Sequence, residues 1–497
     1  MLKILFVIKE VEYIDPMGLM LLSALAKEKG HSTALLVLTG GDIEKTVREF
    51  SPDVVAFSAK TGEHKYYIEA NLAIKRLKKY VFTVMGGPHA TFFPEIIERH
   101  PFDALCVGEG EDAWTELLDA VENKTSYDSI QNIVTKRNFS RGVKTITRLK
   151  NRDLDKLPFL DRDLFYSSTR LGRFPMRSFM VSRGCPYKCA YCFNHKYNML
   201  YKGLGPLYQR MSVGRVIAEL KDLKARYPTQ FIKFYDDIFI LKDDEWLDEF
   251  AERYPVEVGV PFHCLMRANL LTESILLKLK KAGLASLSMS IESGDDHVRN
   301  KVLKRNMTRA TLVDAFALCR RHNIPTFSNT IYGVPGTTLK EDIGSLDLNI
   351  ECGVTFGEFP LFFPYPRTEL AAYAIEQRAF DGDYDSLHMS YQAGSPLKCF
   401  SKKEKLRQKN LSLLSTVCLV VPALRPVVVN VLIHLPLSGL YFCLYYIVKA
   451  YIIKTRIYPM KLSMKDTLKS IWESFTLERF KHTAEAFKPA LEGGKKR

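Results

Sequence analysis

A chain of 497 residues is too long for one ordinary domain, so we expect two or three domains. Hydrophobic residues make up 46% of it and charged residues 26%, a composition that excludes an intrinsically disordered protein. The formal net charge of +15 suggests a nucleic-acid binder. However, residues 401–497 contain 18 Lys and Arg against 6 Asp and Glu, and so carry +12 of that charge. The near-neutral remainder predicts no nucleic-acid partner.

The first 125 residues alternate short apolar runs, such as "LKILFV", "STALLVL" and "PDVVAFSA", with amphipathic helical patterns. This alternation predicts a Rossmann-like, doubly wound parallel sheet. Ligands of such sheets bind at the carboxyl ends of the strands. The loops expected there contain Ser58, Gly86, Gly87, Pro88, His89, Gly108, Glu109 and Gly110. A plain scaffold whose glycines only make turns is the alternative, and the missing G-x-G-x-x-G disfavours a dinucleotide.

Ser58 after the third strand, followed about one helix later by Gly86-Gly87, resembles the pattern of cobalamin-binding domains. The resemblance implies that the loops named above hold cobalamin. The D-x-H-x-x-G pattern of that family is missing, because residues 9–18 contain no histidine. We therefore expect no lower axial histidine if cobalamin binds, and a domain that has lost the cofactor is the alternative.

After a connector at 126–170, the strand–helix alternation resumes over residues 171–375. The expected strands lie in "FPMRSFMVSRG", "QFIKFYDD", "VEVGVPFHC", "LASLSMSIESG", "IPTFSNTIYGVPG" and "VTFGEFPLFFPYP". Six strands with intervening helices are enough for an open, partial parallel barrel but not for a closed barrel of eight. In parallel barrels the chemistry gathers at the carboxyl ends of the strands.

Cys185, Cys189 and Cys192 follow the first of these strands with C-x3-C-x2-C spacing. A structural zinc site needs four ligands, and no paired C-x2-C or H-x3-H motif lies nearby. An iron–sulfur cube held by three cysteines leaves one iron open for a substrate or cofactor. His195 as a fourth ligand is the alternative, although a loop histidine usually has no such role. The spacing therefore predicts a catalytic iron–sulfur site.

This spacing, with Tyr191 before the last cysteine and "SRGCPYKC" at its start, resembles the signature of the radical S-adenosylmethionine (SAM) family. The resemblance implies a 4Fe–4S cluster on the three cysteines, with SAM on the open iron. Reductive cleavage of SAM then yields a 5′-deoxyadenosyl radical that abstracts a substrate hydrogen. By the same resemblance, SAM contacts Tyr191, Asp236, Asp237, Arg267, Glu292, Gly333 and Pro335. Some of these positions have a structural alternative. The aspartates could cap a helix, Arg267 could form a salt bridge inside the barrel, and Gly333 and Pro335 could simply form a Pro-Gly turn.

Residues 1–375 together resemble the cobalamin-dependent class of radical SAM enzymes. Methylthiotransferases of the same superfamily have three cysteines in their first domain. They are disfavoured, because the first domain here contains only Cys106. We expect C-methylation of a hydrophobic small molecule or lipid, with an electron donor such as flavodoxin or ferredoxin. The alternatives are an oxidative cyclase or rearrangement enzyme without net methyl transfer, and a non-enzymatic iron–sulfur protein at a membrane. The sequence identifies no catalytic residue beyond the cofactor positions.

A linker at 376–410 precedes a mainly helical region at 411–497. Residues 426–448 are 23 uncharged residues, interrupted by Pro436 and Gly439 and flanked by basic residues on both sides. This pattern favours helices that lie in the interface of an anionic membrane, with a true span and a buried hairpin as alternatives. Since the N-terminus lacks signal-peptide anatomy, we expect a cytoplasmic enzyme, peripheral at the inner face of the cell membrane.

Overall fold

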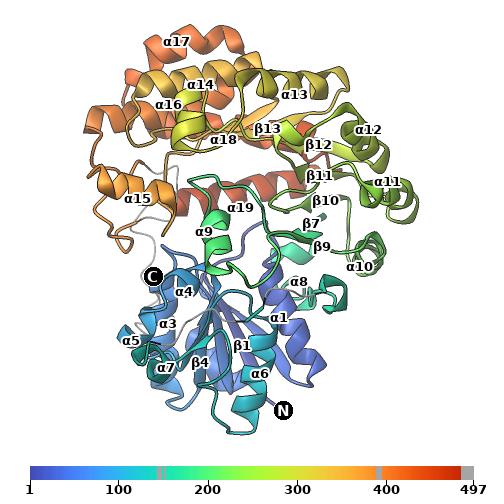
Figure 1. The fold of residues 1–497 in the computed structure, drawn as a ribbon, viewed down its shortest axis with the longest axis vertical. Coiled ribbons are helices and arrows are strands. Elements are labelled where there is room, and N and C mark those ends of the chain that lie inside the picture. Colours follow the sequence, from blue (N-terminus) through green and yellow to red (C-terminus); the bar gives the residue numbers. More distant parts are fainter. Residues whose placement is uncertain (143–147, 150–152, 388–393, 483–497) are drawn as a thin grey trace.

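The computed structural model describes residues 1–142, 148–149, 153–387 and 394–482. Two six-stranded sheets, each covered by helices, form the two main bodies of the chain. Figure 1 shows the first body in blue at the bottom and the second above it, with the C-terminal helices in orange and red. The predicted α/β class, with a helical C-terminal region, is confirmed. The domain boundaries proposed from the sequence stay predictions.

The first sheet has the strand order β2-β1-β3-β4-β5-β6. Its strands are β1 (Lys3–Ile8), β2 (Ser32–Val37), β3 (Val54–Ser58), β4 (Phe82–Gly86), β5 (Ala104–Cys106) and β6 (Ile133–Val134). All pairs are parallel except the antiparallel pair of β5 with β6, which the sequence did not predict. Alternate residues of β1 join separate cores, Ile4 and Phe6 on one face and Leu5 and Val7 on the other. Burial on both faces is typical of a parallel sheet between helices.

The helices of this body are α1 (Met17–Glu28), α2 (Ile43–Phe50), α3 (His64–Leu77), α4 (Gly87–Phe92), α5 (Ile96–Arg99), α6 (Glu111–Glu122) and α7 (Lys136–Ser140). Four of them, α1, α3, α4 and α6, follow the carboxyl ends of β1, β3, β4 and β5. The connections to them therefore meet at one edge of the sheet, where ligands of such folds bind.

The second sheet has the order β14-β13-β12-β11-β10-β7, and all of its pairs are parallel. Its strands are β7 (Met176–Phe179), β10 (Phe231–Phe234), β11 (Phe262–Leu265), β12 (Leu284–Ser288), β13 (Thr326–Asn329) and β14 (Phe356–Glu358). This is the open, six-stranded arrangement that the sequence predicts. One expected strand began too early, because residues 256–257 of "VEVGVPFHC" belong to the preceding helix.

Helices cover the outer face of this open barrel: α10 (Val213–Arg226), α11 (Glu245–Glu257), α12 (Glu273–Ala282), α13 (Arg309–Arg321) and α14 (Leu339–Glu351). Smaller elements are η1 (Leu154–Lys156), α8 (Asp163–Tyr166), η2 (Arg170–Gly172), α9 (Phe193–Leu200), η3 (Ala268–Leu270), η4 (Val298–Val302) and α15 (Glu369–Glu376). Two short strands, β8 (Ser182–Arg183) and β9 (Gln209–Arg210), pair antiparallel beside the barrel. The sequence did not predict this pair.

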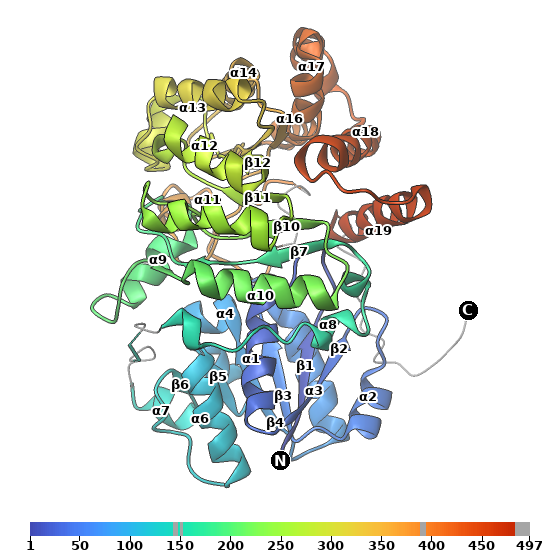
Figure 2. The ribbon, with the colours of Figure 1, turned by 90° about the vertical axis from the view of Figure 1, so that its right-hand side faces the viewer.

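The C-terminal region packs on β14 and α14. It comprises α16 (Lys402–Val420), η5 (Pro422–Leu424), α17 (Arg425–Asn430), η6 (Leu432–His434), α18 (Ser438–Ile452), η7 (Ile453–Ile457) and α19 (Met464–His482). The uncharged run thus contains two helices separated at Pro436, and Figure 2 shows α17, α18 and α19 together on one side of the molecule. Within the described parts of the chain, no helix is both long enough and apolar enough to cross a bilayer.

Asp15, in the loop after β1, connects the two bodies. Its Oδ2 accepts hydrogen bonds from Arg162 Nη1 (3.0 Å), the Tyr166 hydroxyl (3.0 Å) and the Ser178 backbone N–H (2.7 Å). Arg162 and Tyr166 belong to the connector, and Ser178 lies in β7. The carboxylate therefore joins the first sheet, the connector and the first barrel strand at one fully buried point.

Replacing Asp15 by Ala is expected to lower the free energy of unfolding by about 3–5 kcal/mol, because Arg162 would keep a buried charge without its partner. Urea unfolding followed by circular dichroism measures this loss. The matched control is Asp119→Ala, which removes the exposed ion pair of Asp119 with Lys29 (2.6 Å). That change should alter the free energy of unfolding by at most about 1 kcal/mol. Equal losses in the two variants would contradict the role given to Asp15.

Candidate cofactor and active site

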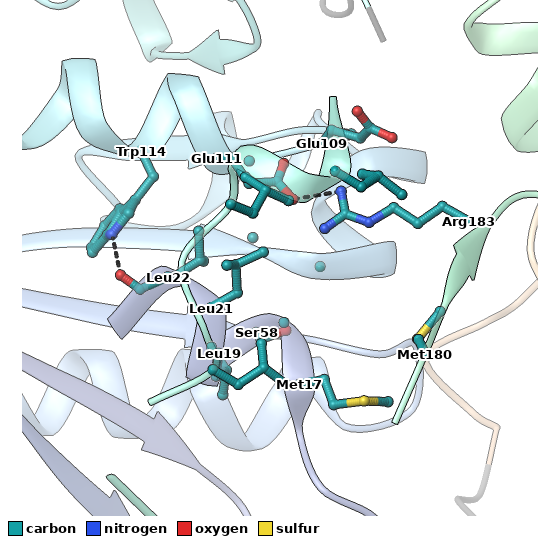
Figure 3. A pocket seen from close by; sticks show the side chains of 18 of the residues that line it. Met17, Leu19, Leu21, Leu22, Ser58, Glu109, Glu111, Trp114, Met180 and Arg183 are labelled. Atoms are coloured by element: carbon teal, nitrogen blue, oxygen red, sulfur yellow. Dashed lines mark hydrogen bonds and ion pairs between the residues drawn. The ribbon is translucent and has the colours of Figure 1, made fainter. Parts of the chain in front are cut away.

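A cavity of about 410 Å³ lies between the carboxyl edge of the first sheet and the start of the cysteine segment (Figure 3). Six of the positions predicted for cobalamin line it: Ser58, Gly86, Gly87, Gly108, Glu109 and Gly110. From the barrel side it is lined by Arg183, Gly184 and Asp237, among others. The structure therefore brings most of the predicted cobalamin loops and the predicted iron–sulfur loop to one space.

Two of these glycines occupy backbone conformations that require glycine. Gly87 has φ +86°, and a Cβ there would lie 2.9 Å from the backbone N and O of Ala59. Gly108 has φ +71°, and a Cβ there would lie 2.1 Å from the Tyr201 hydroxyl. Gly87 allows a tight turn from β4 into α4. Gly108 leaves room for the Tyr201 side chain, which comes from the barrel body.

Pro88 and His89 do not line the first cavity. Pro88 lines a second cavity of about 300 Å³ at the end of β1. His89 stacks on His64 with ring centroids 3.8 Å apart, and its Nδ1 lies 3.0 Å from the Thr61 hydroxyl. Burial lowers the pKa of His89 to about 3, so its ring is neutral. The second cavity shares Met17, Gly18, Leu19 and Ser58 with the first, so the two are adjacent along the sheet edge.

The segment with the cysteines is held in place at its start and within α9. Asp236 Oδ1 accepts hydrogen bonds from the backbone N–H groups of Val181 (3.0 Å) and Ser182 (2.6 Å). Further along, Asn198 Nδ2 of α9 donates to the Cys185 carbonyl (2.8 Å). The backbone of Ala190 donates to the Leu303 carbonyl (3.1 Å). These contacts fix the backbone of the short loop that contains the three cysteines.

The three cysteines have the chemistry that an iron–sulfur cluster requires. All three thiols are free, and Arg267 Nη1 donates to Cys189 Sγ at 3.3 Å. Burial raises the pKa of Cys185, and it raises that of Cys192 to about 12. Thiols this buried stay protonated by themselves and become thiolates on binding metal. Three thiols on one short loop, one of them in contact with a guanidinium, fit a cluster held by three cysteines. In the described part of the chain, no three His, Cys, Asp or Glu side chains are grouped to hold a single metal ion.

Three of the predicted SAM positions form one network around this loop. The Tyr191 hydroxyl donates to Glu292 Oε1 (2.8 Å), and Arg267 lies over the Tyr187 ring with its Cζ 3.7 Å from the centroid. Arg305 joins them, since its Nη1 donates to the Tyr191 hydroxyl (3.1 Å) and its backbone carbonyl accepts from Arg267 Nη2 (2.6 Å). Sequence reasoning missed Arg305, because it follows η4 and belongs to no motif.

The two aspartates at the end of β10 have different surroundings. Asp236 is fully buried, and its Oδ1 accepts hydrogen bonds from the backbone that precedes the cysteines. Burial raises the pKa of Asp236 to about 7. Asp237 lines the main cavity. Of the pair, Asp237 is therefore the one placed to meet a ligand there.

The remaining predicted positions lie elsewhere. The Gly333 backbone donates to Asp342 Oδ1 (2.9 Å) and packs beside Gln408 of α16, and Pro335 is buried in the same turn. His195, the alternative fourth iron ligand, has its Nε2 2.9 Å from Glu369 Oε1 of α15. The roles of all these positions stay predictions.

A Rossmann-like domain whose carboxyl edge faces a three-cysteine loop on an open parallel barrel defines a class of iron–sulfur enzyme with a second cofactor domain. Residues 179–348 match the radical SAM superfamily, and residues 5–118 match the B12 binding domain. The chain therefore contains a radical SAM domain and a B12 binding domain, and it is an enzyme. These domains imply a 4Fe–4S cluster, SAM and cobalamin as cofactors, which confirms the sequence prediction.

Several known proteins resemble this chain over much of its length. An uncharacterized methyltransferase of Pyrococcus horikoshii is 28% identical over 72% of this chain and 78% of that protein. The cytidylyl-2-hydroxyethylphosphonate methyltransferase of Streptomyces wedmorensis is 24% identical over 72% of this chain and 73% of that protein. The anaerobic magnesium-protoporphyrin IX monomethyl ester cyclase of Rubrivivax gelatinosus is 23% identical over 70% of this chain and 64% of that protein.

Two solved structures share the fold. The radical SAM methyltransferase TsrM from Kitasatospora setae has a TM-score of 0.60 and 21% identity, over 76% of this chain and 77% of that chain. The cobalamin-dependent radical SAM enzyme OxsB has a TM-score of 0.60 and 17% identity, over 97% of this chain and 72% of that chain. At these identities the likeness shows a common fold.

The different placement of the two aspartates leads to a prediction about SAM. Replacing Asp237 by Asn should weaken SAM binding about tenfold, since a charged acceptor facing the cavity is lost. Asp236→Asn is the matched control, because it keeps an oxygen acceptor for the backbone of residues 181 and 182. It should leave the SAM affinity within about twofold. Calorimetric titration of the reconstituted protein with SAM measures both, and the reverse order of effects would contradict the assignment.

Proposed function

We propose that this enzyme methylates a carbon atom of a hydrophobic substrate in a cobalamin-dependent radical SAM reaction. The observation that carries the proposal is the shared cavity. Its one side is formed by the loops at Ser58, Gly86-Gly87 and residues 108–111, and its other side by the start of the cysteine loop. Two of the relatives described above are methyltransferases by name, which supports methyl transfer.

The chain's own residues would bind the substrate and exclude water. The cavity walls are largely apolar, with contributions from Leu19, Leu21, Leu22, Trp114, Leu157, Leu160, Phe179, Met180 and Met211. When bound, the cluster supplies the electron that cleaves SAM, and cobalamin supplies the methyl group. An apolar wall protects such reactive species from water and favours an apolar substrate.

A cyclisation or rearrangement without net methyl transfer is the second candidate. It is favoured by the resemblance to the cyclase of Rubrivivax gelatinosus, which extends over 70% of this chain. Both reactions use the same iron–sulfur loop and require an external reductant. They differ in the products that SAM leaves behind.

Counting those products distinguishes the two reactions. With reconstituted iron and sulfide, excess reductant and hydroxocobalamin under anaerobic conditions, we expect both 5′-deoxyadenosine and S-adenosylhomocysteine. The second product should require hydroxocobalamin. Cys189→Ser should remove nearly all 5′-deoxyadenosine, whereas Cys399→Ser, at an exposed cysteine outside the site, should not change it. 5′-Deoxyadenosine without S-adenosylhomocysteine would favour cyclisation, and no SAM cleavage at all would contradict the proposal.

We further propose that the C-terminal helices rest on an anionic membrane, which would bring the enzyme to a hydrophobic substrate. Leu440, Leu444, Ile447 and Tyr451 of α18 are 63%, 39%, 67% and 67% exposed. Their spacing places them on one stripe of the helix, while Tyr441 and Tyr445 on another stripe are buried. An exposed apolar stripe of this size is typical of an interaction surface.

Neighbouring helices add further exposed apolar side chains, and the local charge favours an anionic surface. Val427 and Val431 at α17, and Leu468 and Trp472 of α19, are each about half exposed or more. Residues 405–472 contain ten Lys and Arg and a single acidic residue, Asp466. Apolar side chains flanked by basic ones are the pattern of helices that bind anionic lipid.

Sedimentation with vesicles tests this attachment. We expect the enzyme to bind vesicles that contain 30% phosphatidylglycerol, and to bind pure phosphatidylcholine at least tenfold more weakly. The double variant Leu440→Glu/Ile447→Glu should lose binding. Val256→Glu, at an 84% exposed position on α11, is the control and should retain it. A dimer in solution that the double variant dissociates would contradict membrane attachment, because the stripe would then be a subunit interface.

A further inference from the structure

The cysteine segment is attached to the first domain at its beginning. Arg183, two residues before Cys185, forms an ion pair with Glu111 of α6, with Nη1 and Oε1 2.6 Å apart. Figure 3 shows Arg183 reaching from the barrel side to Glu111 at the wall of the cavity. The Glu111 side chain is buried and that of Arg183 is only a quarter exposed, so the pair is partly shielded from water. Such a pair restricts relative movement more than one on the open surface does.

The same segment is attached to the first domain at its end. Helix α9 begins at Phe193, directly after the last cysteine, and is followed by Tyr201. The Tyr201 hydroxyl accepts a hydrogen bond from the Glu109 backbone N–H (2.7 Å), in the space left free at Gly108. Its ring is buried in the core of the first domain together with Leu105 and Val107. Both ends of the cysteine segment are therefore anchored on one turn, residues 108–111.

That turn also forms part of the cavity wall. All four of its residues, Gly108, Glu109, Gly110 and Glu111, line the cavity between the domains. A ligand bound there contacts the residues that hold the two ends of the cysteine segment. Contacts such as that of Ala190 with Leu303 tie the middle of the segment to the barrel. The anchors at Arg183 and Tyr201 thus connect the segment to the cobalamin side of the site.

We propose that the turn at residues 108–111 couples the two cofactor sites, with Arg183, Glu111 and Tyr201 as positioning residues. Cobalamin in the cavity stabilises the turn, and the turn holds the cysteine segment in the conformation that accepts the cluster. Since binding free energies are reciprocal, a loaded cluster strengthens cobalamin binding by the same factor that cobalamin strengthens cluster loading. The proposal depends on the two cofactors and not on the methyl-transfer step.

Binding measurements test this coupling without any assay of activity. The dissociation constant of hydroxocobalamin is measured by absorption titration of the cluster-free and the reconstituted protein. Iron and acid-labile sulfide per chain are measured after reconstitution with and without hydroxocobalamin. We expect the reconstituted protein to bind hydroxocobalamin about fivefold more tightly or better. Iron loading at limiting iron should rise correspondingly when hydroxocobalamin is present.

Variants of the anchors separate coupling from simple stability. Glu111→Gln and Arg183→Gln should each reduce the ratio of the two dissociation constants to about one, and the exchange variant Arg183→Glu/Glu111→Arg should restore it. Tyr201→Phe keeps the buried ring and loses the acceptor for the Glu109 N–H, so it should lower the ratio in part. Glu116, on the same helix as Glu111, is the control. Glu116→Gln removes its ion pair with Arg148 (2.7 Å) and should leave the ratio unchanged.

Two results would overturn the proposal. One is equal affinity of cluster-free and reconstituted wild-type protein for hydroxocobalamin. The other is a ratio in Glu111→Gln equal to that of the wild type. If the single variants do not fold, as judged by circular dichroism, failure of the folded exchange variant to restore the ratio also overturns it. Coupling without formation of S-adenosylhomocysteine would contradict methyl transfer and leave this inference intact.

Discussion

The buried carboxylate of Asp15 ties the two halves of this enzyme together. One oxygen receives hydrogen bonds from the connector and from the first barrel strand, while its backbone belongs to the loop after β1. A buried carboxylate with these partners tolerates little displacement, because each lost bond leaves a polar group without water or partner. The carboxyl edge of the first sheet is thereby held against the beginning of the barrel. The shared cavity is a consequence of this orientation.

Parallel sheets place their ligand-binding loops at one edge, and the two sheets here bring such edges together. The turn at residues 108–111 belongs to the first edge and the cysteine segment to the second. Their contact through Glu111 and Arg183 joins the two edges at the wall of the shared cavity. Cavity walls that are apolar on both sides then suit chemistry from which water must be excluded.

Much of this arrangement could be predicted from local sequence patterns. The apolar strands and the spacing of Cys185, Cys189 and Cys192 predicted both sheets and the loop expected to hold the cluster, because these signals are local. The two-residue strands β6, β8 and β9 are too short to show a period. Other features depend on contacts between distant segments. They are the different surroundings of Asp236 and Asp237, the stacking of His89 on His64, and the burial of Tyr201 in the first domain. Such contacts leave no pattern in a single sequence.

The C-terminal helices also have features that the sequence pattern alone does not predict. The uncharged run at residues 426–448 favoured helices in a membrane interface, with a span and a buried hairpin as alternatives, and did not predict which face of α18 is buried. The structure buries the stripe with Tyr441 and Tyr445 against α16 and leaves Leu440 and Ile447 exposed. Arg425 and Lys449 are paired with Asp347 and Glu358, so these basic residues are partly neutralised within the protein. Toward α19, Lys461 and Lys465 are exposed, whereas Lys469 lies 3.9 Å from Glu473 of the same helix. Under the proposed membrane attachment, the exposed ring of Trp472 would lie at the boundary between water and lipid headgroups, where aromatic side chains with a polar group are enriched.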